Sequence, residues 1–243
     1  MGSSVKADND AVRLGSFQYL MASVPNSLHR NGRVLTRRDK DGSDAGREGV
    51  DLEARCMSVQ DARRQESTAR CTLIQNGFEL SARPLSGKSI DFLNQEQVVR
   101  TYYSQCAEIV RETTGARFVA AFDHNIRSAA GKESKRRIQG GQQVQGPAHL
   151  VHGDYTLTSA PQRLRDLTKV PGANDTFHSL LPDGESLLDA AEVEHVLAGG
   201  RFAIINVWRN ITDDPVQTSP LALCDATSVR PENLVVFEIH YHD

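Results

Sequence analysis

The chain has 243 residues, of which 39% are hydrophobic and 24% are charged, and its formal net charge is −3. This balance is typical of a globular protein with a hydrophobic core, and it argues against a nucleic-acid-binding or membrane-surface protein, which would be strongly basic. No window approaches the ~18 consecutive apolar residues of a membrane span. The four cysteines form no CxxC pair, so they predict neither a zinc site nor a disulfide framework. We expect a cytoplasmic protein with reduced thiols.

The first third of the chain divides into an arm and the beginning of a domain. Residues 1–50 are polar and rich in Gly, Asp and Arg, which predicts a partly flexible N-terminal arm whose apolar patch at 17–24 docks on the core. Residues 51–243 are predicted to form the domain. Within it, 51–70 has a helical pattern, and "TLIQNGFELSARP" (72–84) predicts a β-hairpin around its Asn-Gly pair.

The strongest helix is predicted over 94–114. Asn94 is suited to cap its first turn, and Gly115 is suited to end it in the left-handed conformation. Apolar residues recur at helical spacing and give the helix one face that packs on the core, at Val98, Val99, Tyr102, Tyr103, Cys106, Ile109 and Val110.

The remainder of the chain reads as short strands interrupted by helices. Strands are predicted at 116–124, 148–156, 201–208 and 234–241, and helices are predicted from Ser159 over 159–167 and over 184–200. There is no βαβ rhythm, so the pattern indicates an α+β fold with a mainly β core and flanking helices.

"AHLVHGDYT" at 148–156 holds the main candidate site. Residues two apart on a strand point to the same face, so His152 and Asp154 are expected to project together. An imidazole and a carboxylate side by side are two members of the 2-His-1-carboxylate triad that binds non-haem Fe(II). The spacing alone leaves two other readings open. His152 and Asp154 could be polar residues of an edge strand, or His152 could be a general base polarised by Asp154.

Several longer motifs resemble a family of fungal and bacterial oxidoreductases. The motifs are "GF" at 77–78, "TGARFVAAFDHNIR" at 114–127, "PAHLVHGDYT" at 147–156, "RFAIINVWRNI" at 201–211 and "PLALCDATSV" at 220–229. The family is the hydroxylase/desaturase family of the aspergillic-acid-pathway type, which is related to proteins named gibberellin desaturases and to the small component of the cephamycin 7α-methoxylase system.

The resemblance implies a double-stranded β-helix, or jelly roll, that uses Fe(II) and 2-oxoglutarate to hydroxylate or desaturate a small secondary-metabolite-like molecule. It implies that His152 and Asp154 are two iron ligands, and that Asn206, Arg209 and Arg127 are the candidates for cofactor binding. Arginine suits this role because it pairs with a carboxylate through two hydrogen bonds. A structural ion pair or a stack on Trp208 is the other reading of Arg209.

The family pattern also requires a second histidine and a basic residue in a C-terminal segment. The chain stops at "EIHYHD", so we expect a jelly roll that is incomplete at its C-terminus. His240 and His242 are weaker candidates for the third ligand. His124 reads either as a structural cap or as a residue that faces the substrate or supports the metal ligands. A non-catalytic or partner-dependent binding protein of the same fold stays open as the alternative function, and the sequence leaves the oligomeric state open.

Overall fold

The protein forms two compact units in this computed structural model. The first unit is built from segments within 1–82, 148–152 and 220–243, and the second from 83–147 and 153–219. The residues that the structure describes are 12–25, 35–38, 44–65, 70–86, 89–133, 137–141, 143–173 and 175–241. The fold is a mixture of helices and strands.

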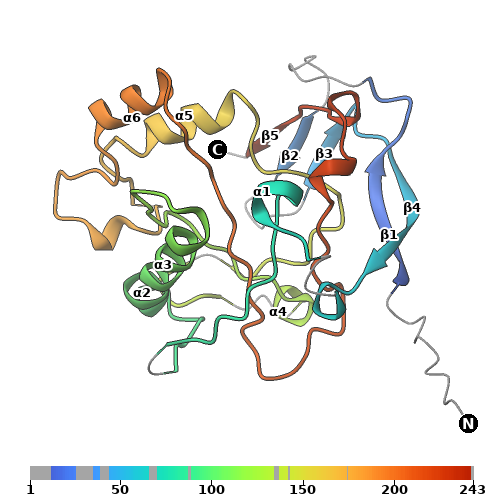
Figure 1. The fold of residues 1–243 in the computed structure, drawn as a ribbon, viewed down its shortest axis with the longest axis horizontal. Helices are drawn as coiled ribbons and strands as arrows, with labels where there is room; N and C mark the ends of the chain where they lie inside the picture. The colour runs from blue at the N-terminus through green and yellow to red at the C-terminus, as the bar shows by residue number, and fades with distance from the viewer. Residues whose placement is uncertain are drawn as a thin grey trace, which may run out of the picture. The chain divides into compact units, whose positions relative to one another are not determined.

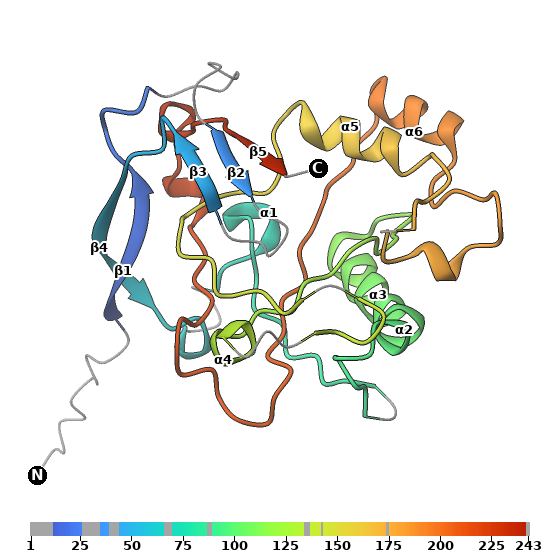
Figure 2. The same cartoon turned by 180° about the vertical axis from the view of Figure 1, so that it is seen from behind.

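Two small sheets organise the first unit. Strand β1 (Val12–Leu20) pairs antiparallel with β4 (Leu52–Gln60) along its whole length, and the two strands run beside each other in Figure 1. The second sheet has the order β3-β2-β5, as Figure 2 shows. Its central strand β2 (Leu35–Arg38) is antiparallel to β3 (Asp44–Glu48) and parallel to β5 (Glu238–Tyr241).

The helix predicted over 51–70 is wrong, because the described part of this segment, up to residue 65, contains β4 and a short 3₁₀ turn, η2 (Ala62–Arg64). Its charged residues allow either conformation locally. Pairing with β1 favours the strand, because β4 lies in register with β1 along its whole length. The helix propensities of these residues differ by only a few tenths of a kcal/mol per residue, which is too little to outweigh this pairing. The apolar patch at 17–24 falls partly on β1.

The β-hairpin predicted over 72–84 is also wrong. Residues Leu73–Asn76 form a single helical turn, α1, which Thr72 caps by accepting a hydrogen bond from the Gln75 N–H at 3.2 Å. Gly77 follows with φ of 80° and donates its N–H to the Leu73 carbonyl. Asn-Gly therefore ends a helix in this protein, since a glycine with positive φ serves a helix C-terminus as well as a hairpin turn.

The helix predicted over 94–114 is confirmed in the second unit. It consists of α2 (Gln95–Gln97), a π-helical turn η4 (Val98–Tyr102) and α3 (Tyr103–Thr114). The Asn94 side chain accepts a hydrogen bond from the Gln97 N–H at 3.1 Å, and Gly115 ends the helix with φ of 67°. Both predicted caps are therefore present.

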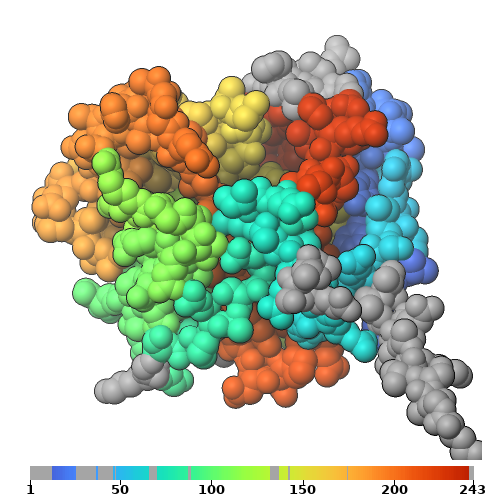
Figure 3. Space-filling model, in the orientation of Figure 1, coloured from blue at the N-terminus to red at the C-terminus, as the bar shows by residue number. Residues whose placement is uncertain are grey.

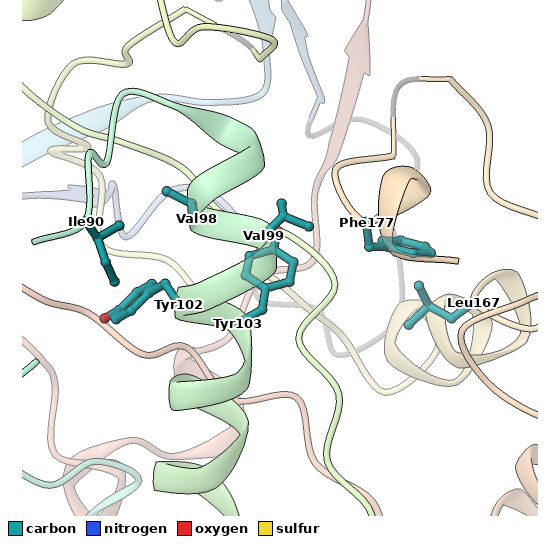
Figure 4. Close-up of a cluster of buried hydrophobic side chains, with 7 residues drawn as sticks. All are labelled: Ile90, Val98, Val99, Tyr102, Tyr103, Leu167 and Phe177. Atoms are coloured by element: carbon teal, nitrogen blue, oxygen red, sulfur yellow. The ribbon is translucent and has the colours of Figure 1, made fainter. Parts of the chain in front are cut away.

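The apolar face of this helix forms the main core of the second unit. Figure 4 shows Val98, Val99, Tyr102 and Tyr103 along the helix, with Phe177 and Leu167 to one side. Val98, Val99 and Phe177 are at most 2% exposed. A smaller cluster is formed by Ile126, Ile138 and Val144. These contacts anchor the segments that carry the polar residues described below.

Two further helices of the second unit lie side by side, as Figure 3 shows in yellow and orange. α5 (Ser159–Asp166) begins where the sequence predicted, and α6 (Ala190–Leu197) is shorter than the predicted 184–200 because Asp189 caps it, accepting a hydrogen bond from the Glu192 N–H at 2.9 Å. Arg165 on α5 and Glu194 on α6 form an ion pair at 2.8 Å. The second unit also contains the short helices α4 (Ala129–Glu133) and η5 (His178–Leu180), and the first unit contains η6 (Ala226–Ser228) and η7 (Pro231–Asn233).

Three of the predicted strands are not formed. Segments 116–124, 148–156 and 201–208 lack strand ladders, although Leu150 makes an isolated parallel bridge to Gln18. The strand predicted over 234–241 is present only as β5, at 238–241. Apolar β-branched runs favour extended backbone, but a strand also needs a neighbouring strand in register, and sequence periodicity does not supply that.

Candidate functional site

His152 belongs to the first unit, where its segment is tied to β1. Gln18 donates its N–H to the His149 carbonyl at 3.3 Å, and the Val151 N–H returns a bond to the Gln18 carbonyl at 2.9 Å. The His152 ring places Nδ1 2.7 Å from the Leu150 carbonyl oxygen. A carbonyl oxygen only accepts, so Nδ1 carries a proton, and in the neutral ring Nε2 is then the nitrogen with the lone pair. This is the usual arrangement of a metal-binding histidine, in which a backbone carbonyl fixes the tautomer.

Asp154 belongs to the second unit, because the division between the units falls between His152 and Gly153. The Asn206 amide donates a hydrogen bond from Nδ2 to Asp154 Oδ2 at 2.8 Å. The sequence selected both residues independently, and the structure brings them together. An amide donor on one carboxylate oxygen orients the carboxylate plane, as the hydrogen-bond partners of metal-binding carboxylates do.

Tyr155 follows Asp154 in the sequence, and Arg163 lies near the Tyr155 hydroxyl. Burial raises the pKa of the Tyr155 hydroxyl, the charges of Asp123 and Asp154 raise it further, and Arg163 opposes them. The Arg163 guanidinium lies 5.0 Å from the centroid of the Phe122 ring. Neither Tyr155 nor Arg163 was predicted as a site residue from the sequence, although Tyr155 directly follows the "HGD" motif.

A second polar group of this unit surrounds His124. The Tyr103 hydroxyl lies 2.9 Å from His124 Nδ1 and 2.7 Å from Thr176 Oγ1. Burial lowers the pKa of His124, and the neighbouring Asp123 carboxylate opposes this effect. Burial raises the pKa of Asp123, against its hydrogen bond from the His124 N–H at 2.8 Å and the charge of Arg163.

The two arginines predicted to bind a cofactor have structural partners. Arg209 donates from Nε to the Tyr102 hydroxyl at 3.1 Å and from Nη2 to the Arg83 carbonyl at 2.6 Å, and its guanidinium lies 5.8 Å from the centroid of the Tyr102 ring. Arg127 donates from Nη1 to the Gly146 carbonyl at 3.0 Å. The stack of Arg209 on Trp208 is not the arrangement found, since Arg209 lies against Tyr102.

Comparison with known proteins identifies the family. The family model described as "YDMC: Oxidoreductase/YMDC permease-like domain" matches residues 25–243. A protein of Methylophilus leisingeri named only for its position in the dcmA 3′ region is 42% identical over 79% of this chain and 88% of its own length. A hydroxylase/desaturase of Hormonema carpetanum is 26% identical over 75% of this chain and 54% of its own. The chain belongs to this hydroxylase/desaturase family of oxidoreductases.

Another relative, whose name states an activity, is an alpha-ketoglutarate-dependent dioxygenase of Talaromyces stipitatus, which is 28% identical over 68% of this chain. The chain spans about half the length of this family member and of the Hormonema protein, at 51% and 54%. No solved structure matches the chain. Within the described ranges, no helix is both long and apolar enough to cross a membrane.

Taken one by one, two side chains of the "HGD" motif have donor atoms of the kind that a ferrous ion binds. An imidazole with Nδ1 bound to a carbonyl and a carboxylate oriented by an amide are donors that non-haem iron uses. Among the residues that the structure describes, however, no group of three His, Cys, Asp or Glu side chains could hold a metal ion. Of the two candidates for a third ligand, His240 has its Nε2 2.8 Å from Glu238 Oε2, and His242 lies outside the described residues.

Proposed function

We propose that the protein is an Fe(II)- and 2-oxoglutarate-dependent hydroxylase or desaturase that acts on a small molecule. The observation that carries the proposal is the His152 ring. Its Nδ1–H bond to the Leu150 carbonyl favours the tautomer in which Nε2 is the nitrogen suited to bind a metal, within the "HGD" motif of a family that includes a named dioxygenase. Iron and 2-oxoglutarate would together supply the oxidation of an unactivated C–H bond, and the protein would supply ligand geometry and substrate orientation.

We assign His152 and Asp154 as two of the iron ligands. Asn206 supports Asp154 directly through its amide, which favours a role beside the ligand over contact with the co-substrate. Arg209 and Arg127 stay proposed partners for the carboxylates of 2-oxoglutarate, because guanidinium groups retain further N–H donors after the bonds that each makes.

The same proposal includes a jelly-roll architecture for residues 51–243, preceded by an arm at 1–50. The mixture of helices and strands is compatible with it. It also includes a cytoplasmic location and a small-molecule substrate in place of a nucleic acid. A protein partner belongs to the alternative, in which this fold binds without catalysing.

Anaerobic titration of the full chain with Fe(II) and 2-oxoglutarate tests the proposal. A bidentate chelate of 2-oxoglutarate on iron gives a visible charge-transfer band, which we expect in the wild-type protein and not in His152→Ala or Asp154→Ala. His149→Ala is the matched control, because its side chain is exposed on the same segment and its backbone carbonyl, which the substitution keeps, accepts the bond from Gln18. Wild-type protein that gives no band while its circular dichroism shows it folded would favour the non-catalytic binder.

A further inference from the structure

A chain of three hydrogen bonds ends at His124, in the "FDHNIR" motif to which the iron chemistry assigns no role. Thr176 Oγ1 lies 3.1 Å from the Phe122 carbonyl oxygen, Tyr103 bonds to the same Thr176 hydroxyl at 2.7 Å, and His124 Nδ1 lies 2.9 Å from the Tyr103 hydroxyl. All four residues belong to the second unit.

The donors in this chain can be assigned one after another. The Phe122 carbonyl accepts only, so the single hydroxyl proton of Thr176 is donated to it. Thr176 must then accept from Tyr103, which uses the single proton of the tyrosine hydroxyl. Tyr103 in turn can only accept from His124, so Nδ1 carries the proton. The chain of bonds therefore fixes His124 in the tautomer whose Nε2 has a free lone pair.

Burial holds this arrangement in place. Tyr103 and Thr176 are each 6% exposed, and Phe177, next to Thr176, is 2% exposed. Figure 4 shows Tyr103 on the helix with Phe177 to one side. The Tyr103 and His124 rings meet edge to face, with centroids 5.6 Å apart and planes at 82°. A change of tautomer would leave Tyr103 and Nδ1 without a proton between them, which costs about 1–3 kcal/mol for a buried pair.

The charges around His124 determine which kind of ligand group could bind to Nε2. His124 is half-buried, and no described residue forms a hydrogen bond with its Nε2. Asp123 precedes it, and the charges near Asp123 are Arg163 and Asp175, which form an ion pair at 4.0 Å. The local balance is therefore negative. A carboxylate ligand would be repelled by this negative charge and by the lone pair of Nε2. A hydroxyl or N–H group would instead donate a hydrogen bond to Nε2.

We propose that His124 is a substrate-binding residue whose Nε2 accepts a hydrogen bond from an O–H or N–H group of the substrate. The word substrate rests on the proposed function, but the site itself needs no iron. Tyr103 and Thr176 are then positioning residues, which act through the ring that they hold. The ligand class that follows is a neutral or cationic small molecule carrying at least one hydroxyl, amide or amine donor.

Long-range ¹H–¹⁵N spectra of the imidazole rings test the tautomer, with the His124 signals assigned by their loss in His124→Asn. We expect the wild-type ring to be protonated at Nδ1, and Tyr103→Phe to raise the population protonated at Nε2. His124→Asn keeps an amide near the position of Nδ1, so it can still bond to Tyr103 while losing Nε2. His178→Asn is the control, since His178 is exposed in the same unit. A wild-type ring protonated at Nε2 would overturn the proposal.

Fragments of equal ring size test the ligand class on the same spectra. Benzyl alcohol and benzamide carry donors, whereas methyl benzoate and benzoate carry only acceptors. We expect the donor-bearing pair to move the Nε2 resonance of His124 and the acceptor-only pair to leave it unchanged. Equal effects from both pairs, or none from the donors, would overturn the inference. Both experiments use protein without iron, so their outcomes are independent of the Fe(II) titration. A failure of that titration would count against the proposed function alone.

Discussion

Asn206 donates a hydrogen bond from its side-chain amide to Asp154 Oδ2 at 2.8 Å, across 52 residues of sequence. The bond joins the "HGD" motif to the "INVWR" motif within the second unit. Replacing Asn206 with Leu keeps the approximate size of the side chain and removes the donor. Mutation of a residue that hydrogen-bonds to a metal ligand typically lowers metal affinity by about 10- to 100-fold, so we expect Asn206→Leu to weaken Fe(II) binding by that factor.

The measurement is a titration with Fe(II) and 2-oxoglutarate under anaerobic conditions. Asn210→Leu is the matched control, because Asn210 is exposed nearby and donates instead to the Asp214 carbonyl at 2.8 Å. Equal affinities in the two variants would show that Asn206 has no part in orienting Asp154.

Local signals in the sequence were sufficient for the long helix and insufficient for the strands. Asn94 and Gly115 cap the helix from within one turn of its ends, so a short stretch contains all the information needed. β4 depends on β1, about 40 residues earlier in the chain, and its own residues indicate a helix equally well. The Asn76-Gly77 pair does not separate a hairpin turn from a helix end, because a glycine with positive φ serves both.

The candidate site was also predictable only in part, because the sequence indicates some of its residues and none of the contacts between them. Family motifs selected Asp154 and Asn206, and their contact follows from the structure. The link between Tyr103 and Thr176 spans 73 residues, and nothing in the local pattern of either residue indicates it. Tyr103 lies on the apolar face of its helix, so the sequence identified it as a core residue without revealing the bond that its hydroxyl makes.

Gly115 provides a test of the helix end. Its φ of 67° lies in the left-handed region, and a Cβ at this position would meet nothing within 4 Å. Any loss on substitution therefore comes from the backbone and not from a clash. We expect Gly115→Ala to lower the free energy of unfolding by about 1–2 kcal/mol, and Gly115→Asn to lower it less, because asparagine tolerates this conformation. Urea denaturation measures both, and equal losses would contradict the explanation.

Phe177 provides a test of the core. It is 2% exposed and packs in the cluster around Val99 and Tyr103 (Figure 4), so its truncation leaves a cavity. We expect Phe177→Ala to lower the unfolding free energy by about 3–5 kcal/mol. Phe118 belongs to the same unit and is 64% exposed, and Phe118→Ala should change stability by less than about 1 kcal/mol. Similar losses from both would mean that this cluster is not the core of the unit.

Tyr103 makes the stability of the protein depend on alkaline pH. Burial raises the pKa of its hydroxyl above the usual value of about 10. Above pH 10 the unfolded chain releases the phenolic proton while the folded protein retains it, so the free energy of unfolding falls as pH rises. The stabilisation is fully present below pH 10 and is lost toward the raised pKa.

Tyr103→Phe should remove most of this alkaline dependence and should cost about 1–3 kcal/mol at neutral pH, because His124 and Thr176 lose a buried partner. Tyr155→Phe is the comparison, since its pKa is also raised but its ring is more exposed. Urea denaturation between pH 8 and pH 11 measures the slope for each protein. An unchanged slope in Tyr103→Phe would mean that its hydroxyl ionises as readily in the folded protein as in the unfolded chain, which a hydroxyl bound between Thr176 and His124 should not do.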